Sequence, residues 1–371
     1  MATDLHTTTK TLITIIRAAL NADYAHTSES IACDNWTKVY RMAAQQGVAA
    51  IAWDGVQRLI NEGAITTEQT PDRATKLQWA LTVDIIEKQY HKQRNAIVKL
   101  ADIYAEDGIK MLILKGYGLS TLYPIPQHRS CCDVDIWLFG EQQRADDIIR
   151  KRLGIKIDED KHHHTVFNID GVMIENHYDF LNIHAHHSNR DIEARLKHLA
   201  DKPDDMEISG RKVYRPNANC HALFLLRHAA AHFAAVEIVL RHIIDWAMFV
   251  KYNYNEIDWS WLRDVCRTHN MEVFFDTMNS LASDLCDIDI SCMPGTTRRP
   301  KLEERILNDI LSPEFSKPKP QSGAVRIVAY KIRRWWANRW KHRIVYREGL
   351  IKSFITHVYS HIIKPKSITK L

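Results

Sequence analysis

The sequence predicts an α+β fold in which a small mixed β-sheet core is embedded between an N-terminal and a C-terminal helical region. Apolar residues recur at helical spacing through the first hundred residues and again from about residue 220. Between these regions, residues 111–177 carry short apolar runs typical of strands. A chain of 371 residues can bury a large core, and its length suggests two or three domains.

The N-terminal helical region is expected to span residues 1–107. Its helices are separated by residues that typically end helices or form turns: Gln46-Gly47 and the Thr-Pro-Asp sequence at 70–72. Asp107-Gly108 ends the last helix. The apolar spacing predicts helices within 7–25, at 36–44, at 48–60 and, as one long helix, at 73–105.

The core is expected to span residues 108–200 and to begin with two strands. An apolar run at 111–114 ends at Lys115-Gly116, and a second apolar run carries Asp133 and Asp135. Alternate side chains of a strand share a face, so the two carboxylates project together. Ionised carboxylates this close repel each other unless a cation lies between them, and oxygen ligands suit Mg²⁺ or Mn²⁺. The pair therefore predicts a divalent-metal site.

The residues before the pair favour phosphate chemistry. Mg²⁺ usually takes substrate phosphates as further ligands, which points to phosphoryl or nucleotidyl transfer. Gly116 would let backbone amides approach a polyphosphate, with the Lys115 ammonium beside them. Arg129, in a proline-rich turn, would be a fork-shaped donor to the triphosphate; the alternative is a surface arginine. A second Asp-x-Asp pair, at 287–289, lacks such neighbours and is expected in a solvated loop.

The rest of the core predicts a third carboxylate. Glu175 falls on a strand adjoining the Asp pair, close enough to reach the same metal. His177, on the same face of that strand, would orient Glu175 or contact the nucleotide, unless it only forms local hydrogen bonds. We expect a helix at 141–153 and strands at 155–157, 164–168 and 172–177, the last two joined by an Asp170-Gly171 turn.

Several motifs together resemble a known family. They are Leu-Lys-Gly at 114–116, Leu-Tyr-Pro at 122–124, Arg129, Asp133-Val-Asp135, Ile-Glu-Asn-His at 174–177 and the helical segments 221–232 and 240–246. Over most of residues 36–250 the chain is similar to the uncharacterised nucleotidyltransferase family of the DNA polymerase β-type superfamily. Two departures concern the phosphate loop: Lys115-Gly116 replaces the usual Gly-Ser pair, and the gap from Gly116 to Asp133 is long for the superfamily.

The resemblance implies a nucleotidyltransferase core that transfers a nucleoside monophosphate from a nucleoside triphosphate (NTP) to an acceptor hydroxyl, releasing pyrophosphate. The sequence does not specify the acceptor, for which a sugar, a small molecule, a protein and RNA are the candidates. It does not specify the base of the NTP either. The alternatives are an inactive nucleotide-binding regulator and a membrane-peripheral assembly factor, for example in surface polysaccharide production. Mg²⁺ or Mn²⁺ is implied, with Asp133, Asp135 and Glu175 as catalytic metal ligands and Lys115, Gly116, Arg129, His177, Arg241 and Asp245 as nucleotide-binding residues.

A C-terminal helical domain is expected over residues 201–311, after a polar connector at 201–215. His228 and His232, like Arg241 and Asp245, lie one helical turn apart. They would line the cleft opposite the sheet, unless they only pack in the core or form a helix salt bridge. The histidine runs at 162–164 and 184–187 favour a surface or active-site rim over a zinc site. Helices are expected at 220–233, 237–251, 259–269 and 273–286.

The tail, residues 312–371, is basic and rich in tryptophan. Residues 326–343 contain seven Lys or Arg, four aromatic residues and no acid. The interpretations, in order of preference, are docking on the protein itself, peripheral contact with an anionic membrane and nucleic-acid binding. On one helix a single side would carry Val328, Ile332, Trp335, Trp336 and Trp340.

Composition favours a cytoplasmic protein with anionic ligands. The net charge is +5, and 45% of the residues are hydrophobic, as in ordinary soluble proteins. No apolar run reaches eighteen residues, and no signal peptide is expected at the start. Seven cysteines without a Cys-x-x-Cys motif predict neither a disulfide framework nor a zinc ribbon. A peripheral position at the inner face of the membrane is the alternative location.

Overall fold

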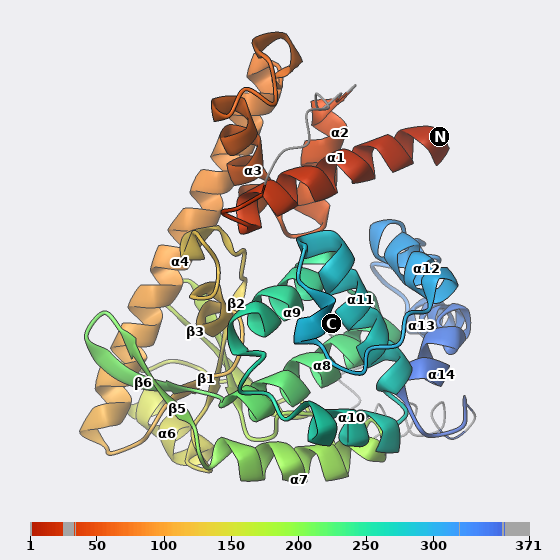
Figure 1. Cartoon of the computed structure of the whole chain (residues 1–371). Helices are drawn as coiled ribbons and strands as arrows, with labels where there is room; N and C mark the ends of the chain where they lie inside the picture. Colours follow the sequence, from red (N-terminus) through yellow and green to blue (C-terminus); the bar gives the residue numbers. More distant parts are fainter. Residues whose placement is uncertain (1, 25–32, 34, 319, 351, 353–371) are drawn as a thin grey trace.

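A computed structural model describes residues 2–24, 33, 35–318, 320–350 and 352 (Figure 1). A six-stranded mixed sheet lies among many helices, which confirms the α+β class. The strands are β1 (Leu112–Ile113), β2 (Asp133–Trp137), β3 (His164–Ile169), β4 (Val172–His177), β5 (Asp204–Ile208) and β6 (Arg211–Arg215).

The helices before the C-terminal half are α1 (Ala2–Leu20), α2 (Trp36–Gln45), α3 (Ala49–Asn61), α4 (Arg73–Glu106), α5 (Tyr117–Ser120), α6 (Gln142–Leu153) and α7 (Ser188–Ala200). They are followed by α8 (Ala218–Ala235), α9 (Leu240–Asn253), α10 (Trp259–Thr268), α11 (Glu272–Cys286), α12 (Pro300–Leu311), α13 (Ala324–Ala337) and α14 (Arg339–Val345). Short 3-10 turns are η1 (Thr67–Gln69), η2 (Pro126–His128) and η3 (Ile290–Cys292).

The order of strands in the sheet is β3-β4-β2-β1-β6-β5. Strand β2 runs parallel to β4, and β1 runs parallel to β6, whereas the other neighbours are antiparallel. The register sets Asp135 opposite Glu175 and Trp137 opposite His177. Cross-strand partners lie on the same face of a sheet. The carboxylates of β2 and β4 therefore share one face, as the alternation in the sequence predicts.

The two faces of the sheet belong to different hydrophobic clusters. On one face, Val134 and Ile136 pack with apolar residues of α4 and α6. On the other, Leu112, Leu114 and Trp137 join the larger core formed with the C-terminal helices. In Figure 1 the sheet lies between the long helix α4 and the helices α8 and α9. Since Asp135 alternates with Val134 and Ile136, the acids face the C-terminal helices.

The predicted helices before the sheet are present, but the first, α1, begins at Ala2 and ends at Leu20, earlier at both ends than the expected range 7–25, whose last residue lies outside the described part of the chain. Asp72 caps the start of α4: its side chain accepts a hydrogen bond from the Thr75 amide at 2.9 Å. The helix ends at Glu106, one residue after the predicted end. The N-terminal helices are fastened to the turn before β2 through His128. Its Nδ1 lies 2.7 Å from Asp54 Oδ2 of α3, and its Nε2 lies 2.9 Å from Glu87 Oε1 of α4.

Two predictions about strands are wrong. Residues 201–215 were expected to form a polar connector, but most of them form the hairpin β5–β6. Strand β6 extends the sheet by pairing with β1. The Ser209-Gly210 turn has φ values of 50° and 78°, the left-handed pair that matches the twist of a hairpin. Residues 155–157 form no strand, and the segment contributes only an isolated bridge between Asp158 and Val166.

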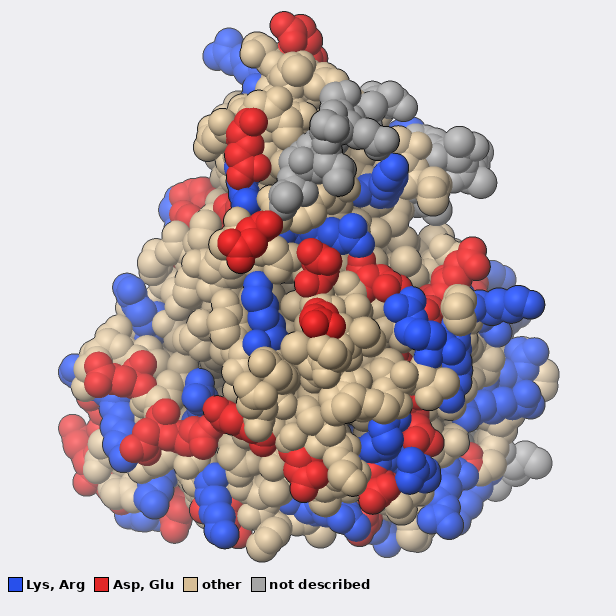
Figure 2. All heavy atoms as spheres, viewed as in Figure 1, with Lys and Arg blue, Asp and Glu red and all other residues tan. Residues whose placement is uncertain are grey.

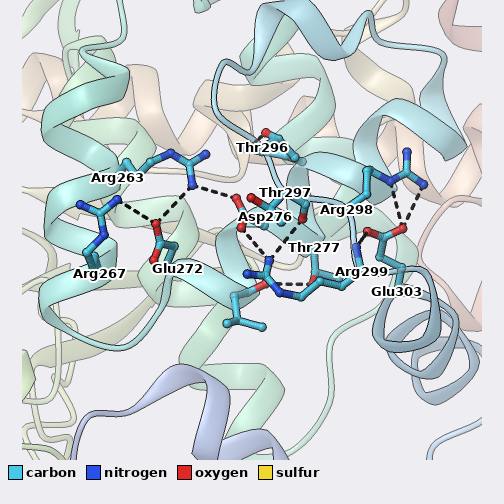
Figure 3. Close-up of polar contacts among 12 residues, drawn as sticks. Arg263, Arg267, Glu272, Asp276, Thr277, Thr296, Thr297, Arg298, Arg299 and Glu303 are labelled. Atoms are coloured by element: carbon cyan, nitrogen blue, oxygen red, sulfur yellow. Dashed lines mark hydrogen bonds and ion pairs between the residues drawn. The ribbon is translucent and has the colours of Figure 1, made fainter.

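A polar network joins α10, α11 and the start of α12 (Figure 3). Asp276 of α11 is almost fully buried and accepts hydrogen bonds from Arg263 at 2.9 Å and Arg299 at 2.7 Å. Beside it, Arg298 Nε lies 3.1 Å from Glu303 Oε2. Two guanidinium groups on one buried carboxylate offset its desolvation cost. This network gives the C-terminal helices one fixed arrangement away from the sheet.

Between residues 324 and 345, the basic tail forms the helices α13 and α14, broken at Asn338, where the sequence predicts one helix. The second, α14, docks on the protein as expected: the Lys341 ammonium lies 2.5 Å from Asp309 Oδ2, and Trp340 packs against Phe233. The first, α13, departs from that expectation, because Val328, Ile332 and Trp336 face solvent. Among the described residues, no helix combines the length and the apolar character that crossing a bilayer requires.

Buried histidines predict acid sensitivity. Burial lowers the pKa of His221 and of His242 to about 3. The unfolded chain takes up protons near pH 6.5, while these rings stay neutral in the folded protein, so the free energy of unfolding falls as pH falls from about 6.5. We expect urea unfolding at pH 7, 6 and 5 to show this fall, with a shallower slope for His221→Gln. The exposed His91 supplies the control, His91→Gln, and equal slopes in all three proteins would contradict the prediction.

Candidate active site

A cavity of about 920 Å³ lies between the sheet and helices α8 and α9. The polar face of β2 and β4 forms one wall, and α8 and α9 form the other. The site residues singled out from the sequence all line this cavity: Lys115, Gly116, Arg129, Asp133, Asp135, Glu175, His177, Arg241 and Asp245. Residues separated by up to 130 positions in the sequence, from Lys115 to Asp245, therefore lie around one cavity.

Asp135 is the centre of the polar cluster and is fully buried. Its Oδ1 lies 3.1 Å from Lys115 Nζ and 3.1 Å from His177 Nε2. Its Oδ2 is buried and has no hydrogen-bond partner among the described residues. Burying a polar atom without a partner is costly. This oxygen is therefore suited to a ligand that the cavity admits.

Glu175 completes a group that could hold a metal. Its Oε2 lies 3.7 Å from His177 Nε2, and ligand atoms of Asp135, Glu175 and His177 all lie within 4.8 Å of one another. Two carboxylates, one of them with the unpaired Oδ2 of Asp135, are the hard donors that Mg²⁺ and Mn²⁺ prefer. The residues present therefore fit a divalent cation.

The charged side chains of the cluster shift one another's pKa values. Burial alone would raise the pKa of Asp135, but the Lys115 ammonium and the hydrogen bond from His177 hold it below its usual value. Burial alone would lower the pKa of His177, but its contacts with Asp135 and Glu175 raise that pKa to about 9. The pKa of Asp133 is raised by its burial and by the neighbouring charge of Asp135. Burial alone would also raise the pKa of Glu175, but its contact with His177 holds that pKa below its usual value, so Asp135 and Glu175 are both ionised.

Asp133 lies outside this tight group, although it lines the same cavity. The parallel register sets it opposite Met173 and not opposite an acid. Its Oδ1 lies 3.8 Å from Cys131 Sγ, at the more exposed start of β2. Of the three acids expected to converge on one point, the structure brings Asp135 and Glu175 together, with His177 beside them, and places Asp133 outside this group.

Lys115 and Gly116 form the bend at the end of β1. Gly116 has φ 58° and ψ −110°, a conformation that side chains disfavour, and a Cβ there would lie 2.7 Å from Cys131 Sγ. Glycine is therefore required by both the backbone and the packing. The Lys115 ammonium contacts Asp135 instead of pointing freely toward a phosphate, so in this state it balances the charge of the buried acid.

Arg129 and Asp245, both predicted to bind nucleotide, are paired with each other. Arg129 Nε donates to Asp245 Oδ1 at 3.0 Å, and Nη2 donates to Oδ2 at 2.7 Å. Tyr123 donates to the same carboxylate at 2.7 Å. In this structure, the guanidinium fork expected to hold a triphosphate is occupied by Asp245. The pair fastens the turn before β2 to α9 and so fixes the shape of the cavity.

Arg241 does not form the helix salt bridge with Asp245 that their spacing allows. Its Nη1 donates instead to the carbonyl oxygen of Ser130 at 3.0 Å, and its Nε is buried without a hydrogen-bond partner among the described residues. One turn apart on α8, His228 and His232 face the cavity as expected, with ring centroids 4.4 Å apart. His163 and His164 also line the cavity, in agreement with the active-site rim that was one interpretation of the run at 162–164. Sequence reasoning missed His242, which no motif in the sequence singled out.

Comparison with known proteins agrees with this geometry. The family model described as "uncharacterised nucleotidyltransferase" matches residues 32–287, a range that contains the entire sheet, both walls of the cavity and the polar cluster. No curated protein and no solved structure gave a match. Because the match takes in well over half of the sequence, the chain belongs to this uncharacterised nucleotidyltransferase family.

Proposed function

We propose that the protein is a metal-dependent nucleotidyltransferase, which moves a nucleoside monophosphate from an NTP to an acceptor hydroxyl and releases pyrophosphate. The observation that carries the proposal is the buried Asp135 oxygen without a partner, facing a cavity with Glu175 and His177 beside it. Cavities of this volume accommodate ligands of nucleotide size. Membership of the family supports nucleotidyl transfer in general.

Asp135 and Glu175 would hold the divalent cation, Mg²⁺ or Mn²⁺, with Asp133 within reach on the same face. When bound, such an ion neutralises phosphate charge and makes the acceptor hydroxyl more acidic. The acidic cluster alone would repel a triphosphate, so nucleotide binding should depend on the cation. This dependence separates the proposal from simple electrostatic binding by a basic protein.

The chain itself supplies positioning and charge. Gly116 lets the backbone approach the phosphates closely, and Lys115 stands beside it as a cation within the cavity. Arg241 faces the cavity with an unused Nε–H group, which makes it a better candidate for phosphate contact than the paired Arg129. Holding the acceptor hydroxyl in line with the α-phosphate would provide much of the rate, because it removes the entropic cost of bringing the reactants together.

The acceptor can be identified by incubating the protein with a cell extract, Mn²⁺ and each NTP in turn, radiolabelled on the α-phosphate. We expect one labelled product for the preferred base and no product when EDTA removes the metal. A sugar, a small molecule, a protein side chain and an RNA end are distinguishable by their sensitivity to protease and nuclease. Metal-dependent NTP binding in calorimetry without any labelled product would favour the inactive regulator instead.

A second proposal, peripheral contact with an anionic membrane, is favoured by the surface of α13. One stripe of this helix exposes Val325 by 83%, Val328 by 42%, Ile332 by 47% and Trp336 by 62%. Figure 2 shows Lys and Arg side chains gathered along the right-hand edge, where Figure 1 places α12 to α14. An exposed apolar stripe with basic flanks is the pattern of an interfacial helix.

Vesicle flotation tests this contact. The protein should float with vesicles that contain phosphatidylglycerol and remain free with phosphatidylcholine alone, because the basic flanks need anionic headgroups. The double variant Val328→Glu/Ile332→Glu should lose binding, since it places acids in the stripe. The control Ile290→Glu, at another exposed apolar residue, should bind like the wild type. Equal flotation of both variants would exclude α13 as the contact.

A further inference from the structure

Three histidines meet beside the carboxylates of the cavity. His164 of β3 is the cross-strand partner of His177 of β4, and His163 immediately precedes β3. The ring centroids of His163 and His164 lie 5.4 and 5.1 Å from that of His177. One ring nitrogen from each of the three lies within 4.8 Å of the others. We infer that these imidazoles form a site for a transition-metal ion of the zinc class.

The histidines have unsatisfied nitrogens. Nδ1 of His163 and Nδ1 of His164 are buried and lack a hydrogen-bond partner among the described residues. His164 is 9% exposed and His177 is 2% exposed, so solvent does little to compensate these rings. A buried polar atom without a partner costs about 1–3 kcal/mol. The convergence of one nitrogen from each ring, within 4.8 Å of the others, suits a ligand that takes nitrogen donors.

The sheet and a neighbouring backbone group hold the rings in place. Two of the three histidines are paired across adjacent strands, which restrains their separation. Nδ1 of His177 lies 3.1 Å from the carbonyl oxygen of Asp179, a contact that orients the ring. Its Nε2 lies 3.1 Å from Asp135 Oδ1 and would give up its proton on binding the metal. A hydrogen bond on the far nitrogen is the usual way in which a protein orients a metal-binding imidazole.

Glu175 connects this site to the carboxylate site. Its Oε1 lies 3.6 Å from His164 Nε2, and its Oε2 lies 3.7 Å from His177 Nε2. Three imidazoles with one carboxylate in reach match the four-coordinate N and O donor sets of zinc. Imidazole suits Zn²⁺ and Co²⁺, whereas Mg²⁺ prefers oxygen. The inference adds a second metal ion to the proposed function. It rests on the proposed function only in placing this ion next to a bound nucleotide.

The test is titration of the metal-free full-length protein with Co²⁺, whose visible ligand-field bands report coordination number. We expect one Co²⁺ per chain with the intense bands of a four-coordinate site, displaced by Zn²⁺ but not by millimolar Mg²⁺. His163→Gln and His164→Gln should each weaken Co²⁺ binding at least about tenfold. The control is His184→Gln, at an exposed histidine of the second run, which should bind like the wild type. Circular dichroism of each variant verifies that it is folded.

Three results would overturn the inference: no Co²⁺ binding, weak bands of an octahedral oxygen site, or unchanged affinity in folded His163→Gln and His164→Gln. The variant Asp133→Asn separates it from the proposed function. It should lose transfer and keep the four-coordinate Co²⁺ spectrum. Transfer with Mg²⁺ in a protein that binds no Co²⁺ would remove this inference alone. An intact Co²⁺ site in a protein without transfer activity would remove the proposed function alone.

Discussion

Replacing Asp135 by asparagine is expected to lower the rate of nucleotide transfer at least about 10³-fold, the scale seen when a preorganised charge at a reaction centre is removed. The substitution keeps the size of the side chain and removes the charge. Asp135 is fully buried, its Oδ2 is unpaired, and it contacts both Lys115 and His177. No neighbouring acid can take over this position, because the register sets Glu175 opposite it and Asp133 one step further out.

The chain offers a matched control for this variant. Asp287 belongs to the second Asp-x-Asp pair and is the exposed residue that ends α11 in a left-handed conformation, which asparagine also adopts. Asp287→Asn should therefore retain full transfer activity. Initial rates of both purified variants, with circular dichroism to verify their folding, complete the test. Wild-type activity in a folded Asp135→Asn protein would remove the proposed centre.

The largest effect on stability is expected for Asp245→Ala, which should lower the free energy of unfolding by about 3–5 kcal/mol. The substitution leaves Arg129, whose side chain is 6% exposed, as a buried charge without its carboxylate. Tyr123 loses its acceptor at the same time. Removing both charges with Arg129→Met/Asp245→Leu should recover much of the loss, because apolar residues of similar size can replace a buried ion pair.

Urea unfolding of Arg129→Met, Asp245→Leu and the double variant gives the coupling energy of the pair. The exposed pair Lys88–Asp84, with N and O 2.6 Å apart, serves for comparison. Asp84→Ala should change the free energy of unfolding by less than about 1 kcal/mol, since exposed pairs are screened by solvent. An Arg129 that was free to bind phosphate would give a different result: Asp245→Ala would then be near neutral for stability and would tighten nucleotide binding.

Local patterns in the sequence predict the strands that carry the acids. Asp133 and Asp135 alternate with apolar residues, and the Asp170-Gly171 turn sets the register of β4, so Glu175 could be placed on the same face. The β5–β6 hairpin was missed because it is mostly polar. Its Ser209-Gly210 turn was a visible signal, but only pairing with β1 makes β6 part of the sheet.

Contacts between distant residues could not be predicted. The Arg129–Asp245 pair spans 116 positions, so the sequence indicates two charged residues near a cleft without showing that each is the partner of the other. The tail shows the same limit. One pattern of apolar residues predicts an amphipathic face, but the break at Asn338 and the buried ion pair of Lys341 decide that α14 faces inward while α13 exposes its stripe.

We propose that the acids of β2 and β4 bind the metal ion on which nucleotidyl transfer depends. The most direct measurement follows both ends of the NTP, labelled in parallel on the α- and on the γ-phosphate, in the presence of Mg²⁺ and the acceptor. We predict that the α-label enters the acceptor and the γ-label leaves in pyrophosphate, each only with the metal and with Asp135 intact. Entry of the γ-label into the acceptor, or release of pyrophosphate that persists in Asp135→Asn, would contradict the claim.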